Sequence, residues 1–490
     1  MEEDVSKILG RQVTFESNTH IGNTVSKKLR GIPPKVSEKV STYQCAVTVF
    51  RAHKLIFLDS PETTSTLYRF DGRIWTPVTS TWLRDIILET LDIKELVSIS
   101  SLETYVKNVR NFLAGLASVE YSHGKCFTEE DFSRVKNRAV FLDCVYDATT
   151  GAILPHSADL PYEKLIHVNY DPEDTPTPAY DNIISFATDG DPDSMDMFDY
   201  AVGYLAVPNR TGKCLFYFGT APDSGKSILA DSICKCFGDR AYPLEPEHLR
   251  GRFAYANAGN AHIYCCADMR ENRLSATTTS QLKRIVGDRV IRMERKHQNE
   301  EQVTVRFKMM LVSNFPLLID GDQHDVAFYR RVIVLPFIQS VSPEQRDFTL
   351  GEQLNREMST VFSKGVRRLH EIMGKNGGIV FPESQLSRDI KESWYLIPDM
   401  LEEFLEQNVQ EVPCLSNKPP VCLSCTALHE EYKAYLDKIV ATGVNVNECK
   451  YELFREKVVS KYKEVELGRR RLPKGKNPVS CFLNLAYKKK

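Results

Sequence analysis

Apolar and polar positions follow two different rhythms in the first part of this chain. Short apolar runs predict strands, and apolar positions three and four residues apart predict the helices that follow them. The predicted strands are residues 45–50, 54–59 and 66–78, and the predicted helices are residues 81–93 and 102–116. Residues 134–157 predict two further strands around a turn at Ala148–Gly151.

A proline-rich segment, residues 169–182, interrupts this pattern and predicts an extended connector at a domain boundary. Beyond it, the pattern predicts a helix over residues 192–207 and a strand over residues 214–219. Strands and helices then alternate as far as residue 340, and residues 341–412 have helical patterning. This alternation is typical of an α/β nucleotide-binding core.

These patterns divide the chain into four predicted parts. A second proline cluster, Pro413 to Pro420, separates the last part, whose helix–helix–strand pattern is compatible with a winged helix. The parts are a flexible N-terminal arm at 1–41, an α+β domain at 42–175, an α/β ATPase core with helical flanks at 176–412, and a winged-helix-like domain at 413–490.

Composition adds limits on the class of protein. The chain has 490 residues, 42% hydrophobic and 26% charged, which suits a globular protein with several buried cores. No run approaches the roughly 18 apolar residues of a membrane span, and the polar start shows no secretory signal. The 13 cysteines have no framework spacing, so we expect reduced thiols, a cytoplasmic location and no membrane partner.

The clearest chemical motif follows the strand predicted at Cys214–Phe218. A glycine-bearing loop leads into Gly225-Lys226-Ser227 and an amphipathic helix, which is the P-loop arrangement. Backbone N–H groups would hold phosphates, Lys226 would reach the β and γ phosphates, and Ser227 would bind Mg²⁺. The residues expected around ATP are Gly219, Thr220, Ala221, Pro222, Asp223, Ser224, Gly225, Lys226, Ser227 and Ile228. Thr220 stands where the strict pattern has a glycine.

Two later strands end in polar residues that suit the same chemistry. Asp268 follows an apolar strand and is the candidate Mg²⁺ ligand, and Glu271 is the candidate base for the attacking water. Alternatively, Glu271 only caps the next helix. Asn314, at the end of the FKMMLVSN strand, is expected to orient the water, or else it begins a turn before Pro316.

Arg330 and Arg331 directly precede another apolar strand. One of them is a candidate arginine finger, which would stabilise transition-state charge at the ATP of a neighbouring subunit. The alternative is that both arginines solvate the edge of a sheet.

The order of the segments GTAPDSGKS, ADMREN, LKRIVGDRVIRMERKHQ, LVSN and FYRRVIVLPF resembles superfamily 3 helicases. It is most similar to their poxvirus and phage-satellite primase-helicase branch, and the resemblance spans residues 60–490. The resemblance implies a homo-hexameric AAA+ ring that translocates 3′ to 5′ on single-stranded DNA. It also implies a role in replicating a phage, plasmid or mobile element, with other replication proteins as partners.

The same resemblance assigns DNA contacts. Lys296 and His297 would grip the DNA backbone from a hairpin in the ring channel, and Lys283 and Arg292 would support that hairpin. The residues VIRMERKHQNEEQVTVRF by themselves predict two strands around a polar tip. Cationic side chains at such a tip can contact DNA phosphates. An ordinary solvated hairpin end is the alternative.

The C-terminal segment is strongly basic. Residues 468–490 contain eight lysines and arginines and no acidic residue, which suits a wing loop contacting origin duplex phosphates, or else a solubilising tail. The basic residues expected at this loop are Arg469, Arg470, Arg471, Lys474 and Lys476. Cys422, Cys425 and His429 suggest zinc, but a single CxxC favours core thiols.

Three functions besides a motor enzyme suit this sequence. The chain could be an origin-binding initiator whose ATPase acts only as an assembly switch and which melts DNA without processive unwinding. It could be the helicase part of a primase-helicase, although residues 1–150 show no clustered acidic metal pair for priming. A small-molecule P-loop kinase is the third, which the hairpin and the basic C-terminus disfavour.

Overall fold

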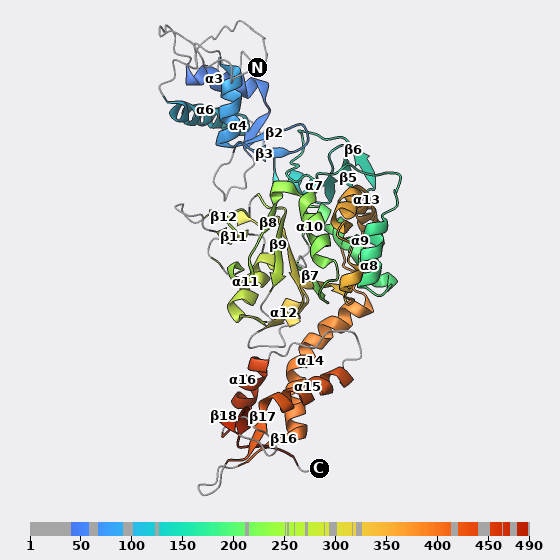
Figure 1. Ribbon diagram of the computed structural model, residues 1–490. Helices are drawn as coiled ribbons and strands as arrows, with labels where there is room; N and C mark the ends of the chain where they lie inside the picture. Colours follow the sequence, from blue (N-terminus) through green and yellow to red (C-terminus); the bar gives the residue numbers. More distant parts are fainter. Residues whose placement is uncertain are drawn as a thin grey trace. The chain divides into compact units, whose positions relative to one another are not determined.

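The structure of the chain, a computed structural model, is drawn in Figure 1. It describes residues 41–57, 67–91, 101–122, 127–210, 215–249, 251, 254–258, 260–269, 273–288, 290–293, 301–315, 317–319, 326–412, 420–439, 451–462, 464–470 and 478–488. These residues form two compact units, which are described separately. Of the described residues, the first unit holds most of those up to residue 122, and the second holds residues 72–74 and those from 127 onwards.

Among its described residues, the first unit packs three helices with a small antiparallel sheet of order β1-β2-β3. Its elements are α3 (Thr42–Ala52), β1 (Leu55–Phe57), β2 (Leu67–Phe70), β3 (Trp75–Pro77), α4 (Ser80–Thr90) and α6 (Leu102–Ser122). The helices predicted at 81–93 and 102–116 are therefore confirmed. Of the predicted N-terminal arm, only Ser41 is among the described residues.

The strand predicted at 45–50 is wrong, because these residues lie in α3. Valine and threonine favour strands locally, yet Ser41 and Gln44 form a capping box that begins a helix. The buried residues Cys45, Ala46 and Val49 then fall on one helical face. Tertiary burial and the cap together outweigh the local β preference.

The second unit begins with α7 (Glu129–Val135) and a three-stranded antiparallel sheet. Its strands are β4 (Arg138–Val140), β5 (Val145–Asp147) and β6 (Ala152–Leu154). The turn predicted at Ala148–Gly151 joins β5 to β6, and Gly151 has the left-handed φ of 74° that favours glycine. Residues 127–175 thus belong to the second unit, whereas the ranges 42–175 and 176–412 remain predictions.

The predicted connector at 169–182 is shorter than expected, because α8 (Pro178–Ala187) begins inside it. Proline suits the first helical position, where its missing N–H costs nothing. The carboxylate of Glu357 accepts hydrogen bonds from the N–H groups of Ala179 and Tyr180 at 2.9 and 2.8 Å. A distant residue therefore caps a helix that the local proline content concealed. The helix predicted at 192–207 is α9 (Pro192–Ala206).

A five-stranded parallel sheet of order β15-β7-β13-β9-β8 forms the centre of this unit. Its strands are β7 (Leu215–Thr220), β8 (Ala241–Pro243), β9 (Ile263–Met269), β13 (Lys308–Ser313) and β15 (Val332–Phe337). Every residue of β13 and β15 is buried, as expected where helices cover both faces of a parallel sheet. The predicted α/β class of this region is confirmed.

Helices and short elements surround the sheet. They are α10 (Lys226–Cys236), η1 (Gly238–Arg240), η2 (Pro246–His248), β10 (Arg273–Leu274), α11 (Ala276–Gly287), β11 (Val290–Met293), β12 (Glu301–Thr304), β14 (Leu318–Ile319), α12 (Val326–Tyr329), η3 (Pro343–Gln345), α13 (Leu350–Asn376) and α14 (Gln385–Asn408). In Figure 1, α8, α9 and α13 gather on one side of the sheet and α11 lies on the other. None of the described helices is long and apolar enough to cross a membrane.

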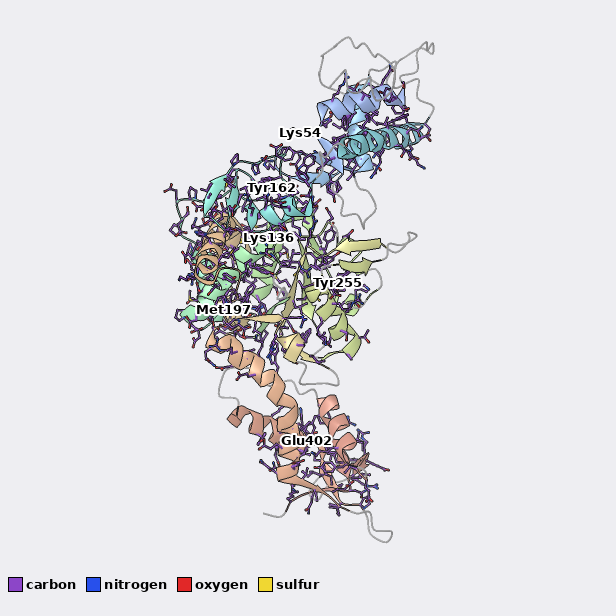
Figure 2. All side chains as sticks on the ribbon, turned by 180° about the vertical axis from the view of Figure 1, so that it is seen from behind. Lys54, Lys136, Tyr162, Met197, Tyr255 and Glu402 are labelled. Atoms are coloured by element: carbon purple, nitrogen blue, oxygen red, sulfur yellow. The ribbon has the colours of Figure 1, made fainter. Side chains whose placement is uncertain are left out.

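The C-terminal part has the two predicted helices and the strands predicted after them, and the unpredicted strand β17 precedes these helices. Its elements are β16 (Val409–Glu411), β17 (Cys422–Ser424), α15 (Cys425–Ile439), α16 (Tyr451–Lys461), β18 (Glu466–Arg470), β19 (Val479–Leu483) and β20 (Leu485–Tyr487). Lys461 on α16 donates to Glu402 on α14 at 2.7 Å, and Glu402 is labelled in Figure 2. Cys425 is fully buried in the core.

Candidate functional site

The loop between β7 and α10 is tightly wound around one lysine. The ammonium of Lys226, only 5% exposed, donates to the carbonyl of Ala221 at 2.5 Å. The hydroxyl of Ser224 donates to the same carbonyl at 2.9 Å. Asp223 and Gly225 have φ values of 49° and 85°, so the chain passes twice through the left-handed region. The turn therefore places Lys226 at the start of α10 with its amine inside the loop.

Neighbouring strands hold this loop in place. The N–H of Ala221 donates to the carbonyl of Phe337, the last residue of β15, at 2.8 Å. The N–H of Val341 donates to the carbonyl of Asp223 at 3.1 Å. No side chain caps the N-terminus of α10, so the first N–H groups of this helix are left for another acceptor. These groups and the helix dipole favour an anion there.

A pocket of about 800 Å³ opens above the loop. Its size is within the range of roughly 300–1,000 Å³ that is typical of ligand sites. Its lining residues come from the loop, α8, the end of β13 and the segment after β15. They are Asn182, Ile183, Phe186, Pro222, Asp223, Ser224, Gly225, Lys226, Ser227, Ile228, Asn314, Val341, Gln345, Arg346, Asp347, Phe348 and Leu350.

Two helices pack against this loop and the first turn of α10. A Cβ built on Gly225 would lie 3.7 Å from Cγ2 of Ile183 on α8, and one on Gly351 of α13 would lie 3.7 Å from Cγ2 of Ile228. Both contacts are ordinary van der Waals distances. The pocket thus has its walls on elements far from the loop in sequence.

An ion pair links two lining residues of the pocket. The guanidinium of Arg346 donates to the carboxylate of Asp223 at 2.7 Å, with the two side chains 43% and 55% exposed. The pair compensates the negative charge that Asp223 brings to the loop. Ser227 is exposed and lines the pocket, so its hydroxyl is accessible to a cation or a phosphate.

The parallel sheet brings the predicted polar residues to one edge. All five strands run in the same direction, so the carboxyl ends of β7, β9 and β13 lie together. Asn314 follows β13 directly, is exposed and lines the pocket. Asp268 lies in β9, the strand next to β13. Open α/β sheets bind ligands at this edge, where the strand order reverses.

The backbone of β9 is irregular at Asp268. Leu311 pairs with Cys266 and Ser313 pairs with Met269, so β9 has one more residue than β13 in this interval. Such a bulge re-aims side chains and is common beside active sites. Glu271 lies outside the described residues.

The two candidate finger arginines lie at the opposite edge of the sheet from the pocket. Arg330 is exposed and Arg331 half-buried, just before β15 begins at Val332. The six residues of β15 span about 20 Å at about 3.3 Å per residue. Neither arginine is therefore placed to serve the loop of its own chain. Arg331 lies against α11, because a Cβ on Gly287 would meet its guanidinium at 3.4 Å.

The predicted hairpin exists as β11 and β12, paired antiparallel from Val290↔Thr304 to Met293↔Glu301. Arg292 lies in β11, and Lys283 lies half-buried on α11. Lys296 and His297, at the tip, lie outside the described residues.

A residue that the sequence did not single out holds the base of this hairpin. The guanidinium of Arg210 donates to the carbonyls of Val286, Asp288 and Val305 at 2.8–3.1 Å, and also to that of Ile285. A cation at the C-terminus of α11 is favourable for the helix dipole.

Arg469 and Arg470 are exposed on β18, opposite Ser480 and Val479 of β19. The segment joining these two strands, with Arg471, Lys474 and Lys476, lies outside the described residues. Two of the five predicted basic residues are thus at the end of an antiparallel hairpin.

Apart from Asn314, the lining residues outside the loop were missed at the level of sequence, among them Asn182, Ile183, Phe186, Arg346 and Phe348. Their segments have no motif, and their place depends on the pairing of Phe337 with Thr220. A signal did exist in the short polar segment SVSPEQRD, residues 340–347, which lies between β15 and α13.

The donor set suits a nucleoside triphosphate with Mg²⁺. Helix N–H groups and Lys226 complement phosphate charge, and the hydroxyl of Ser227 is an oxygen ligand of the kind Mg²⁺ takes together with substrate phosphates. The described residues contain no group of three or more His, Cys, Asp or Glu side chains that would hold a metal without such a substrate.

Comparison with known proteins gives two results. Residues 217–331 match a family described as "Family of unknown function (DUF5906)". Two apo structures of the NrS-1 C-terminal region are similar, each at 14% identity over 91% of this chain and 100% of that chain, with TM-scores of 0.42 and 0.41.

Proposed function

We propose that this chain is an ATP-dependent DNA helicase of the P-loop AAA+ type, which acts in the replication of a phage, plasmid or mobile element. The observation that supports it best is the pocket at the carboxyl edge of the parallel sheet. There the Lys226 loop, Ser227 and Asn314 come together from two strands. ATP and Mg²⁺ are the proposed cofactors.

Each of these groups has a proposed task. The N–H groups at the start of α10 and the ammonium of Lys226 bind the phosphates, with the carbonyl of Ala221 holding the amine in the loop. Ser227 and Asp268 would hold the Mg²⁺, which would neutralise phosphate charge, and Asn314 would orient the attacking water. Glu271 is the proposed base that accepts the proton of the water.

The place of Arg330 and Arg331 supports a homo-oligomer. These residues are about one strand length from the pocket edge, so they suit the ATP of an adjacent copy better than their own. A closed ring gives every pocket such a neighbour. A homo-hexamer is the form that the superfamily 3 resemblance implies.

DNA is the proposed substrate, along which the chain would translocate. Lys296 and His297 lie between β11 and β12 in sequence, and Arg210 fixes the base of this hairpin to α11. Two helices followed by strands, with exposed Arg469 and Arg470, suit a winged helix that contacts origin duplex.

The test is displacement of a strand from a forked duplex that lacks any origin sequence. We expect the wild type to displace the strand with ATP, faster with a 3′ tail, and Lys226→Ala to displace none. Lys235→Ala is the matched control, since Lys235 lies on the same helix, exposed and paired with Asp231. We expect it to retain full activity. Wild-type protein that fails to hydrolyse ATP would overturn the proposal.

A second function deserves the same experiment because the C-terminal hairpin is basic. If the wild type hydrolyses ATP and binds DNA yet displaces nothing, the chain is an initiator that ATP switches. Melting of origin DNA would then identify that function, and the permanganate reactivity of unpaired thymines would measure it.

A further inference from the structure

Three exposed apolar side chains line one pocket. Phe348 is 93% exposed, Phe186 is 41% exposed and Ile228 is 36% exposed, and all three line the pocket above the β7–α10 loop. A fully exposed phenylalanine is unfavourable in water unless it contacts a ligand or a partner. Apolar surface gathered at one concave site indicates a flat or apolar ligand group there.

The phosphates that the loop would bind do not account for this apolar surface. Its own donors, Lys226 and the first N–H groups of α10, complement phosphates, which are strongly polar. The two aromatic residues lie on other segments, Phe186 on α8 and Phe348 just before α13. A ligand that fills the pocket therefore needs an anionic part and a flat apolar part, joined within one molecule. A nucleotide has both.

We infer that Phe348 and Asn182 form the subsite for the base of the bound nucleotide, with the ring of Phe348 stacked on the base. This inference rests on the proposed function, because it takes the loop as the triphosphate site. Aromatic rings stack on bases of every kind, so Phe348 contributes affinity. The selectivity has to come from a polar group at the base edge.

Asn182 provides that group. It is exposed, lines the pocket on α8 and donates no side-chain hydrogen bond to another described residue. A carboxamide donates one hydrogen bond and accepts another, which matches N7 and the N6 amino group of adenine. At the same edge guanine presents two acceptors, N7 and O6, so the carboxamide oxygen would have no donor. Asn182 therefore favours ATP over GTP.

The test compares two probes, MgATP and magnesium tripolyphosphate, by titration calorimetry on the full chain. Phe348→Ala should weaken MgATP about tenfold, which corresponds to about 1.4 kcal/mol, and leave tripolyphosphate binding unchanged. Phe348→Trp should retain or strengthen MgATP binding. Phe112→Ala, a change at another exposed phenylalanine, is the control and should leave both probes unaffected.

Each outcome is informative. Equal weakening of both probes by Phe348→Ala, or no weakening of MgATP, would overturn the base subsite. Asn182→Ala should reduce the preference for MgATP over MgGTP, and an unchanged preference would remove Asn182 from the inference. Lys226→Ala should weaken both probes. If the wild type binds neither probe, the proposed function itself fails, which is a separate result from failure at Phe348.

Discussion

Gly203 on α9 and Gly365 on α13 cross so closely that neither position has room for a side chain. A Cβ on Gly203 would lie 1.9 Å from the carbonyl oxygen of Gly365, and a Cβ on Gly365 would lie 2.7 Å from the nitrogen of Gly203. Both contacts are to backbone, which cannot rotate away. The helices could accept a side chain only by separating, and α13 also packs against the first turn of α10 through Gly351.

Gly365→Ala should therefore lower the free energy of unfolding by about 3 kcal/mol, the upper end of the usual cost of overpacking. Urea unfolding followed by circular dichroism measures it. Gly374→Ala is the matched control on the same helix, because a Cβ there meets nothing within 4 Å. That change should stabilise the protein by about 0.5–1 kcal/mol through helix propensity. Equal destabilisation by both changes would contradict the close crossing.

His262 gives a pH dependence with a definite sign. Its ring stacks on Phe237 with centroids 4.0 Å apart, and its Nε2 donates to the carbonyl of Leu205 at 2.6 Å. Burial lowers its pKa well below the ordinary 6.5, and the cations of Lys164, Lys308 and Arg240 lower it further. The folded protein thus keeps His262 neutral, whereas the unfolded chain takes up a proton as the pH falls through 6.5.

Stability from this residue is therefore present above pH 6.5 and is lost as the pH falls below it. Below pH 6.5 the slope from this residue should approach about 1.4 kcal/mol per pH unit, and urea unfolding between about pH 7.5 and about pH 5 measures it. His262→Gln should be less stable at neutral pH but show a shallower slope. His248→Gln, a change at an exposed histidine, should keep the wild-type slope. A wild-type slope in His262→Gln would contradict this assignment.

The sequence predicted those parts of the site that are local. Residues 219–228 are contiguous, so strand, loop and helix could be identified together from their own pattern. Asn314 could be found in the same way, because it ends an apolar strand. Arg346 and Phe348 could not, because the order of β15 beside β7 decides their position and no local pattern encodes that order.

The errors in the fold have the same origin. Residues 45–50 alternate in a way that suits a strand, but the cap at Ser41 and burial against α6 favour a helix. Pro178 has the local pattern of a connector, but it begins a helix that Glu357, far along the chain, caps. Local propensity is a weak preference that tertiary contacts overrule.

The ion pair between Arg346 and Asp223 predicts a double-mutant result. Arg346→Ala leaves the Asp223 carboxylate uncompensated beside the proposed phosphate site, so MgATP affinity should fall about fivefold, or about 1 kcal/mol. Asp223→Asn in the same chain should restore it. Asparagine is chosen because φ at this position is 49°, which Asn tolerates.

Two controls belong to this prediction. The unfolding free energy should change by less than about 0.5 kcal/mol, because exposed ion pairs contribute little to stability. Raising the salt concentration should reduce the Arg346→Ala defect through screening. If the double variant binds MgATP as weakly as Arg346→Ala alone, Arg346 contacts the nucleotide directly, and charge compensation of Asp223 is the wrong explanation.

The exposed arginines of β18 predict a change in salt dependence. If Arg469 and Arg470 each neutralise one phosphate of duplex DNA, replacing both with alanine should reduce the slope of log Kd against log salt by about 2, at about 0.9 per phosphate. Fluorescence anisotropy of a labelled duplex at several salt concentrations measures the slope. ATP hydrolysis without DNA should be unchanged, because β18 contributes nothing to the pocket lining. The control replaces Arg356 and Lys235, two exposed cations elsewhere, with alanine. An equal loss of slope in that control would mean that the C-terminal hairpin attracts DNA only as part of the total charge, without a defined contact.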